Sequence, residues 1–510
     1  MEQKMKNQQH ITVNTAEGQL AGTAEGEIAV FKGIPYAAPP TGERRWRPPA
    51  AVTPWHGCRD ALAWGSASWQ SREVCMEIGG GDPALPDEDC LYLNVWTPEI
   101  EPVRPLPVIV WIHGGGYALG AGSLAPYSGK PLAARGVVMV TLNYRLGHLG
   151  FFAHPALDAE YPAGKTINNF ALLDQIAALQ WVQRNIPAFG GDRHNVTIMG
   201  ESSGARSVLS LFCSPLAQGL FHKGIAQSAY ALPDVSRTEA LALGEKVARH
   251  FSLEQPSAEQ LRALPAEALT LLPPGMRIGP TPIAGDAVLP LPMLKVFARA
   301  RQHKLPILIG SNSDESSVLD YFGVNASALV ADLRRRRRPV YKLLNWMYDL
   351  HDDRALGRAV SRDMAFTAMS QLVVAAQCQV GMPGWRYWFD YVSERSRDLC
   401  PDGAWHGAEI VYTLNTLDQV PAIEAGREIT DGDRAFAEDV SQYWLNFARY
   451  ATPFSSTLEG KVAWPAWRPD NDITLCLGRQ GEAHISLKEN FMKRRLRILS
   501  LFRRAMVKLK

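Results

Sequence analysis

Residues 196–208 read Val-Thr-Ile-Met-Gly-Glu-Ser-Ser-Gly-Ala-Arg-Ser-Val. A β-prone run leads into the pattern Gly-x-Ser-x-Gly and then into a segment compatible with a helix. This order predicts a sharp strand-to-helix turn that exposes the hydroxyl of Ser202 above the edge of a sheet. Gly200 and Gly204 leave room where the backbone passes too close for a Cβ. Because the pattern alone also occurs in ordinary turns, its meaning depends on the rest of the chain.

A glycine-rich loop lies about 90 residues upstream of this turn. The apolar run from Leu106 to Ile112 predicts a buried strand, and it ends in His113-Gly114-Gly115-Gly116-Tyr117. Adjacent glycines after a strand leave backbone N–H groups uncovered, and in ester hydrolases such groups bind the oxyanion of the tetrahedral intermediate. The two motifs together predict a serine hydrolase.

A serine nucleophile needs a base and an orienting acid, which this class of hydrolase supplies later in the chain, in the order Ser, acid, His. The strand-like run 306–310 leads into a loop that carries two adjacent carboxylates, Asp314 and Glu315. By chemistry alone either could orient the base. Neighbouring side chains in an extended loop point in opposite directions, so only one of them can face it. Among the twelve histidines, His406 is the best candidate base, because it lies between small residues just before a predicted helix that starts at Glu409.

At this point the chain resembles a known family, the type-B carboxylesterases, which include para-nitrobenzyl esterases and the cholinesterases. The resemblance covers nearly the whole chain and rests on ordered motifs, namely Phe31-Lys32-Gly33-Ile34-Pro35-Tyr36-Ala37-Ala38-Pro39-Pro40, Glu88-Asp89-Cys90-Leu91-Tyr92-Leu93-Asn94-Val95-Trp96, Asn143-Tyr144-Arg145 and Phe189-Gly190-Gly191-Asp192. It implies an α/β-hydrolase fold, with a central, mostly parallel twisted sheet, helices on both faces and long inserted cap loops and helices. Since the candidate catalytic elements run from residue 113 to residue 406, we expect residues 1–510 to form a single domain.

The resemblance also implies a role for each matching residue. It makes the protein a serine carboxylesterase that works through an acyl-enzyme and requires no metal or organic cofactor. The implied nucleophile, acid and base are Ser202, Glu315 and His406, the implied oxyanion donors are the N–H groups of Gly115, Gly116 and Ser203, and the implied hydrogen-bonding residues near the catalytic histidine are Glu201 and Ser228.

Four positions depart from the family pattern. Ser203 stands where Ala is usual, Tyr117 where Phe is common, Ala171 where Gly is usual and Arg193 where Pro is typical. None of these changes removes a catalytic group, because a backbone N–H survives an exchange of Ala for Ser. The hydroxyl of Ser203 is expected near the reacting centre, where it could alter the choice of substrate.

Two other functions are compatible with the fold. A non-catalytic, cholinesterase-like interaction protein is disfavoured, because all three members of the triad are present. An enzyme that acts mainly on amide, carbamate or carbonate bonds remains open, since the same triad can attack each of these carbonyl groups.

Charge and hydropathy restrict the partners. The formal net charge of +2 does not direct the protein toward nucleic acid, so we expect a small-molecule ester as its ligand and a monomer or a small homo-oligomer as its state. The five arginines 334–338 are interpreted as a solvated helical face. Residues 491–510 predict a basic amphipathic helix, which could lie on an anionic membrane or, as we favour, pack its apolar stripe on the body of the protein.

The chain shows no run of 18 apolar residues and no apolar secretion segment near its start, which predicts a cytoplasmic enzyme. Seven scattered cysteines without a Cys-x-x-Cys pair suggest neither a zinc site nor a complete disulfide framework. Cys90 matches a position that forms a disulfide in secreted members of the family, with Cys75 as the conceivable partner. In a reducing cytosol both should remain thiols.

Overall fold

The computed structural model describes residues 11–500 except 79, 163, 278, 280, 320–324 and 420–427. The chain divides into two compact units, each assembled from distant parts of the sequence. The first unit comprises Met1–Ile225, Pro233–Val296 and Leu414–Pro421, and the second comprises Ala226–Leu232, Phe297–Thr413 and Ala422–Lys510. The single domain expected for 1–510 therefore stays a prediction.

The strands of the first unit lie in the order β1-β2-β3-β5-β7-β6-β8. Their bounds are Ile11–Thr15, Gly18–Glu25, Ile28–Pro35, Tyr92–Thr97, Val138–Leu142, Leu106–Ile112 and Gly191–Glu201. Neighbours are antiparallel from β1 to β7, whereas β6 runs parallel to both β7 and β8. The parallel part contains the predicted strand 106–112 and the β-prone run before Ser202, and its apolar runs are buried on both faces, as a parallel sheet requires.

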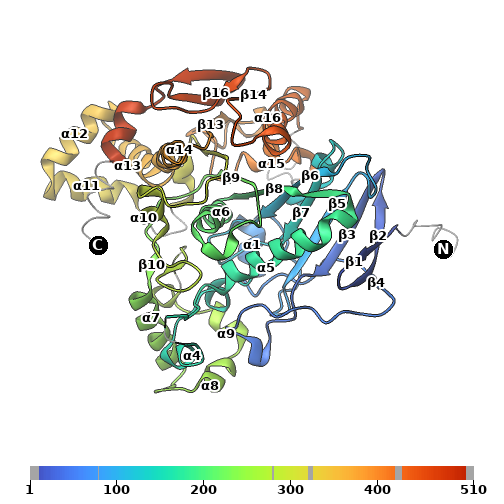
Figure 1. Cartoon of the computed structure of the whole chain (residues 1–510). Helices are drawn as coiled ribbons and strands as arrows, with labels where there is room; N and C mark the ends of the chain where they lie inside the picture. Colours follow the sequence, from blue (N-terminus) through green and yellow to red (C-terminus); the bar gives the residue numbers. More distant parts are fainter. Residues whose placement is uncertain are drawn as a thin grey trace. The chain divides into compact units, whose positions relative to one another are not determined.

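Two helices flank the nucleophile motif in the first unit. In helix α5 (Phe170–Asn185) the apolar side chains Leu172, Ile176, Leu179 and Val182 are buried. Helix α6 (Ser203–Cys213) starts directly after β8 and packs against β8 and β6. Figure 1 shows α5 and α6 lying together beside these strands. The predicted α/β architecture is thereby confirmed.

The second unit has a parallel set of strands of its own. Strand β13 (Gly384–Tyr391) pairs in parallel with β12 (Ile307–Asn312) and with the first part of β16 (Ile473–Glu489). Helix α14 (Ala368–Gln379) packs on β12 and β13, and helix α16 (Asp431–Tyr450) packs on β16. Strand β12 begins one residue after the start of the predicted run 306–310 and delivers the chain into the loop with the two carboxylates.

A helical insert in the second unit contains the arginine run. The insert consists of three helices, α11 (Ala326–Arg336), α12 (Arg338–Tyr348) and α13 (Asp353–Arg362), which lie together in Figure 1. They pack around a small apolar cluster. All five arginines are exposed, but they do not share one helical face as predicted. Arg337 breaks the helix, with φ −138° and ψ 53°, and Pro339 lies in the first turn of α12. A proline is well suited to that position, because its missing N–H has no helical partner there.

Residues 493–500, the described part of the predicted basic helix, are helical. Leu496 and Leu499 are 0% and 2% exposed. Arg495 forms an ion pair with Asp363 at 2.8 Å and stacks on the ring of Tyr348, 4.9 Å from its centroid. The apolar stripe of this stretch therefore packs on the second unit, and residues 501–510 lie outside the described residues.

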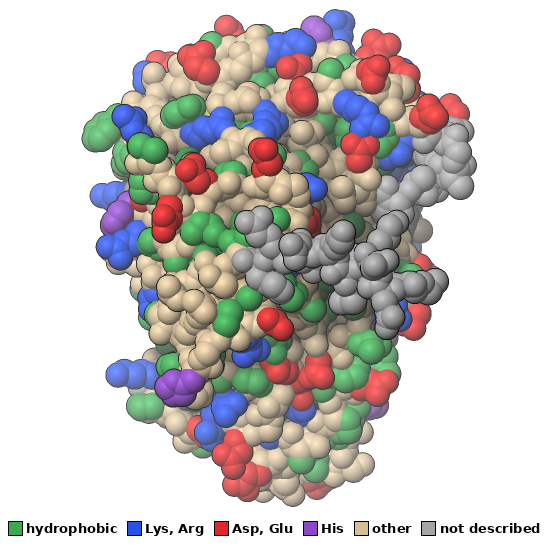
Figure 2. Space-filling model, turned by 90° about the vertical axis from the view of Figure 1, so that its right-hand side faces the viewer, with side chains coloured by type: hydrophobic (Ala, Val, Ile, Leu, Met, Phe, Trp, Pro, Cys, Tyr) green, Lys and Arg blue, Asp and Glu red, His purple; other side chains and the backbone are tan. Residues whose placement is uncertain are grey.

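Surface charge is mixed in sign. On the face shown in Figure 2, basic and acidic side chains are interspersed and do not gather into one patch.

In the described part of the chain, no helix is both long enough and apolar enough to cross a membrane. All seven cysteines, including Cys75 and Cys90, lie in the described ranges and are free thiols there.

Candidate active site

Ser202 lies at a sharp turn between β8 and α6, as the Gly-x-Ser-x-Gly pattern predicts. Its φ of 53° and ψ of −119° place a non-glycine residue in a region that costs about 1–3 kcal/mol. A Cβ on Gly204 would lie 2.0 Å from the carbonyl oxygen of Ile112, and a Cβ on Gly200 would lie 2.5 Å from the carbonyl carbon of Gly204. Both glycines are therefore required by the close passage of helix and strands, which holds the strained serine in place.

The glycine loop 113–117 follows β6 and passes directly beside the turn. A Cβ on Gly114 would lie 3.3 Å from the Cβ of Ser202 and 2.8 Å from Oε2 of Glu201. Gly115 and Gly116 have φ values of 99° and 63°, which glycine adopts without steric cost. The first unit thus brings together Ser202, Ser203, Glu201 and the predicted donors of the loop.

The start of this loop is electrically neutral. Burial lowers the pKa of His113 to about 4, so its imidazole is uncharged near pH 7. Its ring stacks on the ring of Tyr144, with centroids 4.4 Å apart. A neutral residue here adds no charge to the electrostatics beside Ser202.

The second unit brings Glu315 and His406 together, although 91 positions separate them in the sequence. Oε2 of Glu315 lies 2.5 Å from Nδ1 of His406, and its Oε1 accepts the backbone N–H of Asn312 at 2.7 Å. The Glu315 side chain is fully buried, whereas that of His406 is 10% exposed. The hydroxyl of Ser317 accepts the backbone N–H of His406 at 2.9 Å. The carboxylate thus fixes the orientation of the imidazole ring.

Asp314, the neighbouring carboxylate, has other partners. Its Oδ1 accepts the hydroxyl of Ser316 at 2.5 Å, and its Oδ2 accepts a guanidinium N–H of Arg358 at 2.6 Å. The two adjacent side chains therefore serve different groups, as expected for neighbours in an extended loop.

A buried carboxylate that the sequence reading did not single out lies behind this pair. Glu409 is 0% exposed. Its Oε1 accepts the hydroxyl of Ser228 at 3.1 Å and its Oε2 accepts the amide of Asn312 at 2.5 Å. Ser228 is thus connected to the Glu315–His406 pair indirectly, because Glu409 binds both Ser228 and Asn312, and Asn312 binds Glu315. In the sequence, the only indication of this role is that Glu409 follows His406 by three positions. The sequence analysis used Glu409 only as the start of a predicted helix.

The charge of Glu409 makes folding stability depend on pH. Burial, followed by the nearby charge of Glu315, raises the pKa of Glu409 above its ordinary value of 4.5. As pH rises above 4.5, the unfolded chain loses this proton first, so the folded state binds more protons and loses stability. Glu409→Gln removes this titration and keeps the size of the side chain.

We expect the free energy of unfolding of Glu409→Gln, minus that of the parent, to increase from pH 5 to pH 8. Urea unfolding at the two pH values measures it. A difference that is the same at both would contradict the assignment of a raised pKa.

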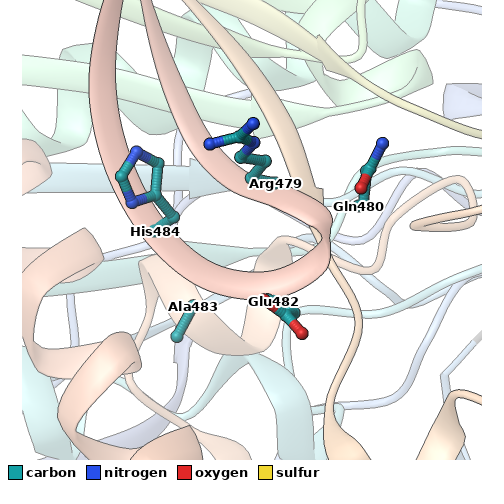
Figure 3. Close-up of a pocket in the computed structure, with 5 residues that line it drawn as sticks. All are labelled: Arg479, Gln480, Glu482, Ala483 and His484. Atoms are coloured by element: carbon teal, nitrogen blue, oxygen red, sulfur yellow. The ribbon is translucent and has the colours of Figure 1, made fainter.

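One hollow in the second unit is lined by none of these residues. It has a volume of about 270 Å³, lies inside the bend of β16 and is lined by Arg479, Gln480, Glu482, Ala483 and His484. Figure 3 shows these side chains pointing in different directions. They do not converge as a catalytic group does, and none of them was predicted as a site residue.

Comparison with known proteins identifies the family. The sequence model of the Carboxylesterase family matches residues 9–497. The chain is 34% identical over 493 residues to the fumonisin B1 esterase of Sphingopyxis macrogoltabida, covering 90% of this chain and 85% of that protein. It is 32% identical over 483 residues to the para-nitrobenzyl esterase of Bacillus subtilis, covering 92% of this chain and 95% of that protein.

Solved structures agree with this result. A thermophilic para-nitrobenzyl esterase superposes with a TM-score of 0.81 at 30% identity, covering 96% of this chain and all of the other. A carboxylesterase of Geobacillus stearothermophilus superposes with a TM-score of 0.79 at 29% identity, covering 96% and 99%. The chain therefore belongs to the carboxylesterase family, and it is a carboxylic ester hydrolase with the α/β-hydrolase fold.

Proposed function

We propose that the protein is a serine carboxylesterase that hydrolyses small-molecule esters through an acyl-enzyme. The observation that carries the proposal is the strained Ser202, which is held between two obligatory glycines and beside a glycine loop. Backbone strain of this kind clusters at active sites, where it holds the nucleophile in the geometry that the reaction requires. The buried Glu315–His406 pair supplies the base and the acid that this chemistry requires.

In the proposed mechanism, His406 accepts the proton of the Ser202 hydroxyl at Nε2 while Oγ attacks the ester carbonyl carbon. Nδ1 keeps its proton and donates it in a hydrogen bond to Glu315, whose negative charge stabilises the imidazolium. The imidazolium then protonates the leaving alcohol as the C–O bond breaks. Water repeats the sequence on the acyl-enzyme, releases the acid and restores Ser202.

The negative charge that develops on the carbonyl oxygen is assigned to three backbone N–H groups, those of Gly115, Gly116 and Ser203. Such donors act by being fixed in place before the reaction, and the loss of one side-chain donor in other hydrolases costs roughly 3–4 kcal/mol. Glu201 lies under Gly114, and Ser228 binds Glu409 behind the acid–base pair. We assign both the task of holding these elements in position.

A panel of chromogenic substrates tests the proposal. It contains para-nitrophenyl esters of increasing acyl length, together with one para-nitroanilide and one para-nitrophenyl carbamate. We expect steady turnover of the esters, and stoichiometric inactivation by an organophosphate bound to Ser202. Faster hydrolysis of the anilide or the carbamate than of every ester would instead support the amide or carbamate alternative. Labelling at any other residue would overturn the assignment of the nucleophile.

A further inference from the structure

The amide of Tyr117, at the end of the glycine loop, is held by a side chain. Tyr117 is 1% exposed and has a φ of 60°, so it continues the left-handed conformation of Gly115 and Gly116. Its N–H donates to the hydroxyl oxygen of Ser203 at 3.2 Å. Its carbonyl oxygen accepts the N–H of Gly147 at 2.7 Å. The N–H and the carbonyl group of Tyr117 are thus both satisfied by partners outside the loop.

The hydroxyl of Ser203 continues the connection back to the start of the loop. It also interacts with the phenol of Tyr144, which partly offsets the rise that burial causes in the pKa of that phenol. The Tyr144 hydroxyl in turn donates to the carbonyl oxygen of His113 at 2.7 Å. Ser203, Tyr144 and His113 are all at most 1% exposed. We call this set of contacts, from Tyr117 through Ser203 and Tyr144 to His113, the loop clasp.

The loop clasp adds outside contacts to a turn in which the carbonyl oxygen of Gly115 accepts the N–H groups of Ala118 and Leu119, both at 3.0 Å. Three consecutive residues with positive φ, Gly115 to Tyr117, form neither helix nor strand, and their conformation persists only when surrounding contacts impose it. The N–H of Tyr117 is buried, so removal of its acceptor leaves an unsatisfied donor, which is more costly than the net value of a hydrogen bond. Of the clasp residues, Ser203 alone binds the loop's last amide.

We propose that the hydroxyl of Ser203 is a positioning group that sets the geometry of the oxyanion donors. The inference rests on the proposed function of the loop. Ser203 then acts twice, since its backbone N–H is itself an assigned donor while its side chain holds the loop that carries the other two. This hydroxyl is therefore engaged with the loop, and its expected effect on the choice of substrate stays a prediction.

A group that positions oxyanion donors affects the transition state more than the bound substrate. Donor geometry matters where the oxygen becomes negative, while the neutral ester in the ground state depends on it weakly. Ser203→Ala should therefore lower kcat by about tenfold and leave KM within about twofold. The inhibition constant of a trifluoromethyl ketone, which forms a tetrahedral oxyanion on the serine, should rise in parallel with the loss of kcat/KM.

Ser207→Ala is the matched control. Ser207 lies one turn later on α6, is 0% exposed, donates to the phenol of Tyr117 at 3.1 Å and accepts from Gln175 at 3.0 Å. The variant thus loses a buried hydroxyl on the same helix, and the bonds that it breaks are to side chains and not to the loop backbone. We expect its kcat and its ketone inhibition constant to stay within about twofold of the parent.

Tyr144→Phe breaks the loop clasp at its other link and should reproduce the kinetic signature of Ser203→Ala. Because both changes break the same clasp, the double variant should lose less than the product of the single losses. Multiplicative losses, or equal ketone binding in Ser203→Ala and Ser207→Ala, would overturn the inference.

Organophosphate labelling of Ser202 in the same variants separates this inference from the proposed function. If Ser202 is labelled and the ketone inhibition constant does not change in Ser203→Ala, the positioning role alone is wrong. If Ser202 of the parent is not labelled, the proposed function itself fails.

Discussion

Ser202→Ala is expected to lower kcat by at least about four orders of magnitude, because the proposed acyl-enzyme cannot form without the hydroxyl. The melting temperature should stay close to that of the parent. Alanine has the same backbone restrictions as serine at a φ of 53°, so the strain of the turn is unchanged. Turnover of a para-nitrophenyl ester and thermal unfolding measure the two effects.

Ser210→Ala provides the control for this experiment. Ser210 is 0% exposed and lies on the same helix, two turns beyond the strained turn. Its loss should leave kcat within about twofold. An active Ser202→Ala variant, with organophosphate label found on Ser203, would move the nucleophile by one residue.

Glu315→Gln is expected to lower kcat by roughly two to four orders of magnitude with little change in melting temperature. The carboxylate of Glu315 contacts Nδ1 of His406 at 2.5 Å. An amide of the same size can donate to that nitrogen and so stabilise the wrong tautomer of the ring. It also removes the negative charge that the proposed imidazolium requires.

Asp314→Asn should show the opposite pattern. Asp314 pairs with Arg358 at 2.6 Å, and Asp402 lies 3.1 Å from the same guanidinium, so the variant weakens a structural ion pair. We expect kcat within about tenfold of the parent and a lower melting temperature. The reverse ranking of the two variants would move the acid to Asp314, and two near-neutral results would place it elsewhere in the chain.

The local parts of the fold were predictable because they depend on neighbouring residues. The apolar run 106–112 predicts a buried strand, and it forms β6. The prediction that the five arginines form one helical face was wrong. Helix α11 ends at Arg336 and α12 begins at Arg338, and a continuous run of one residue type gives no sign of such a boundary. Pro339, which follows the run, lies in the first turn of the next helix. Proline is compatible with a boundary of either kind, and only the packing of α11 against α12 and α13 settles which is formed.

The sequence by itself determined the turn at Ser202, its two glycines and the loop that follows β6, because backbone geometry at such sites is encoded within about five residues. Only the tertiary structure decided which carboxylate contacts His406, that Glu409 lies behind this pair, and that the Ser203 hydroxyl binds Tyr117. These contacts join residues that are far apart in the chain, such as Tyr117 and Ser203, which are separated by 86 positions. A hydrogen bond depends on distance and direction in space, and neither is specified until the packing of strands and helices brings the two segments together.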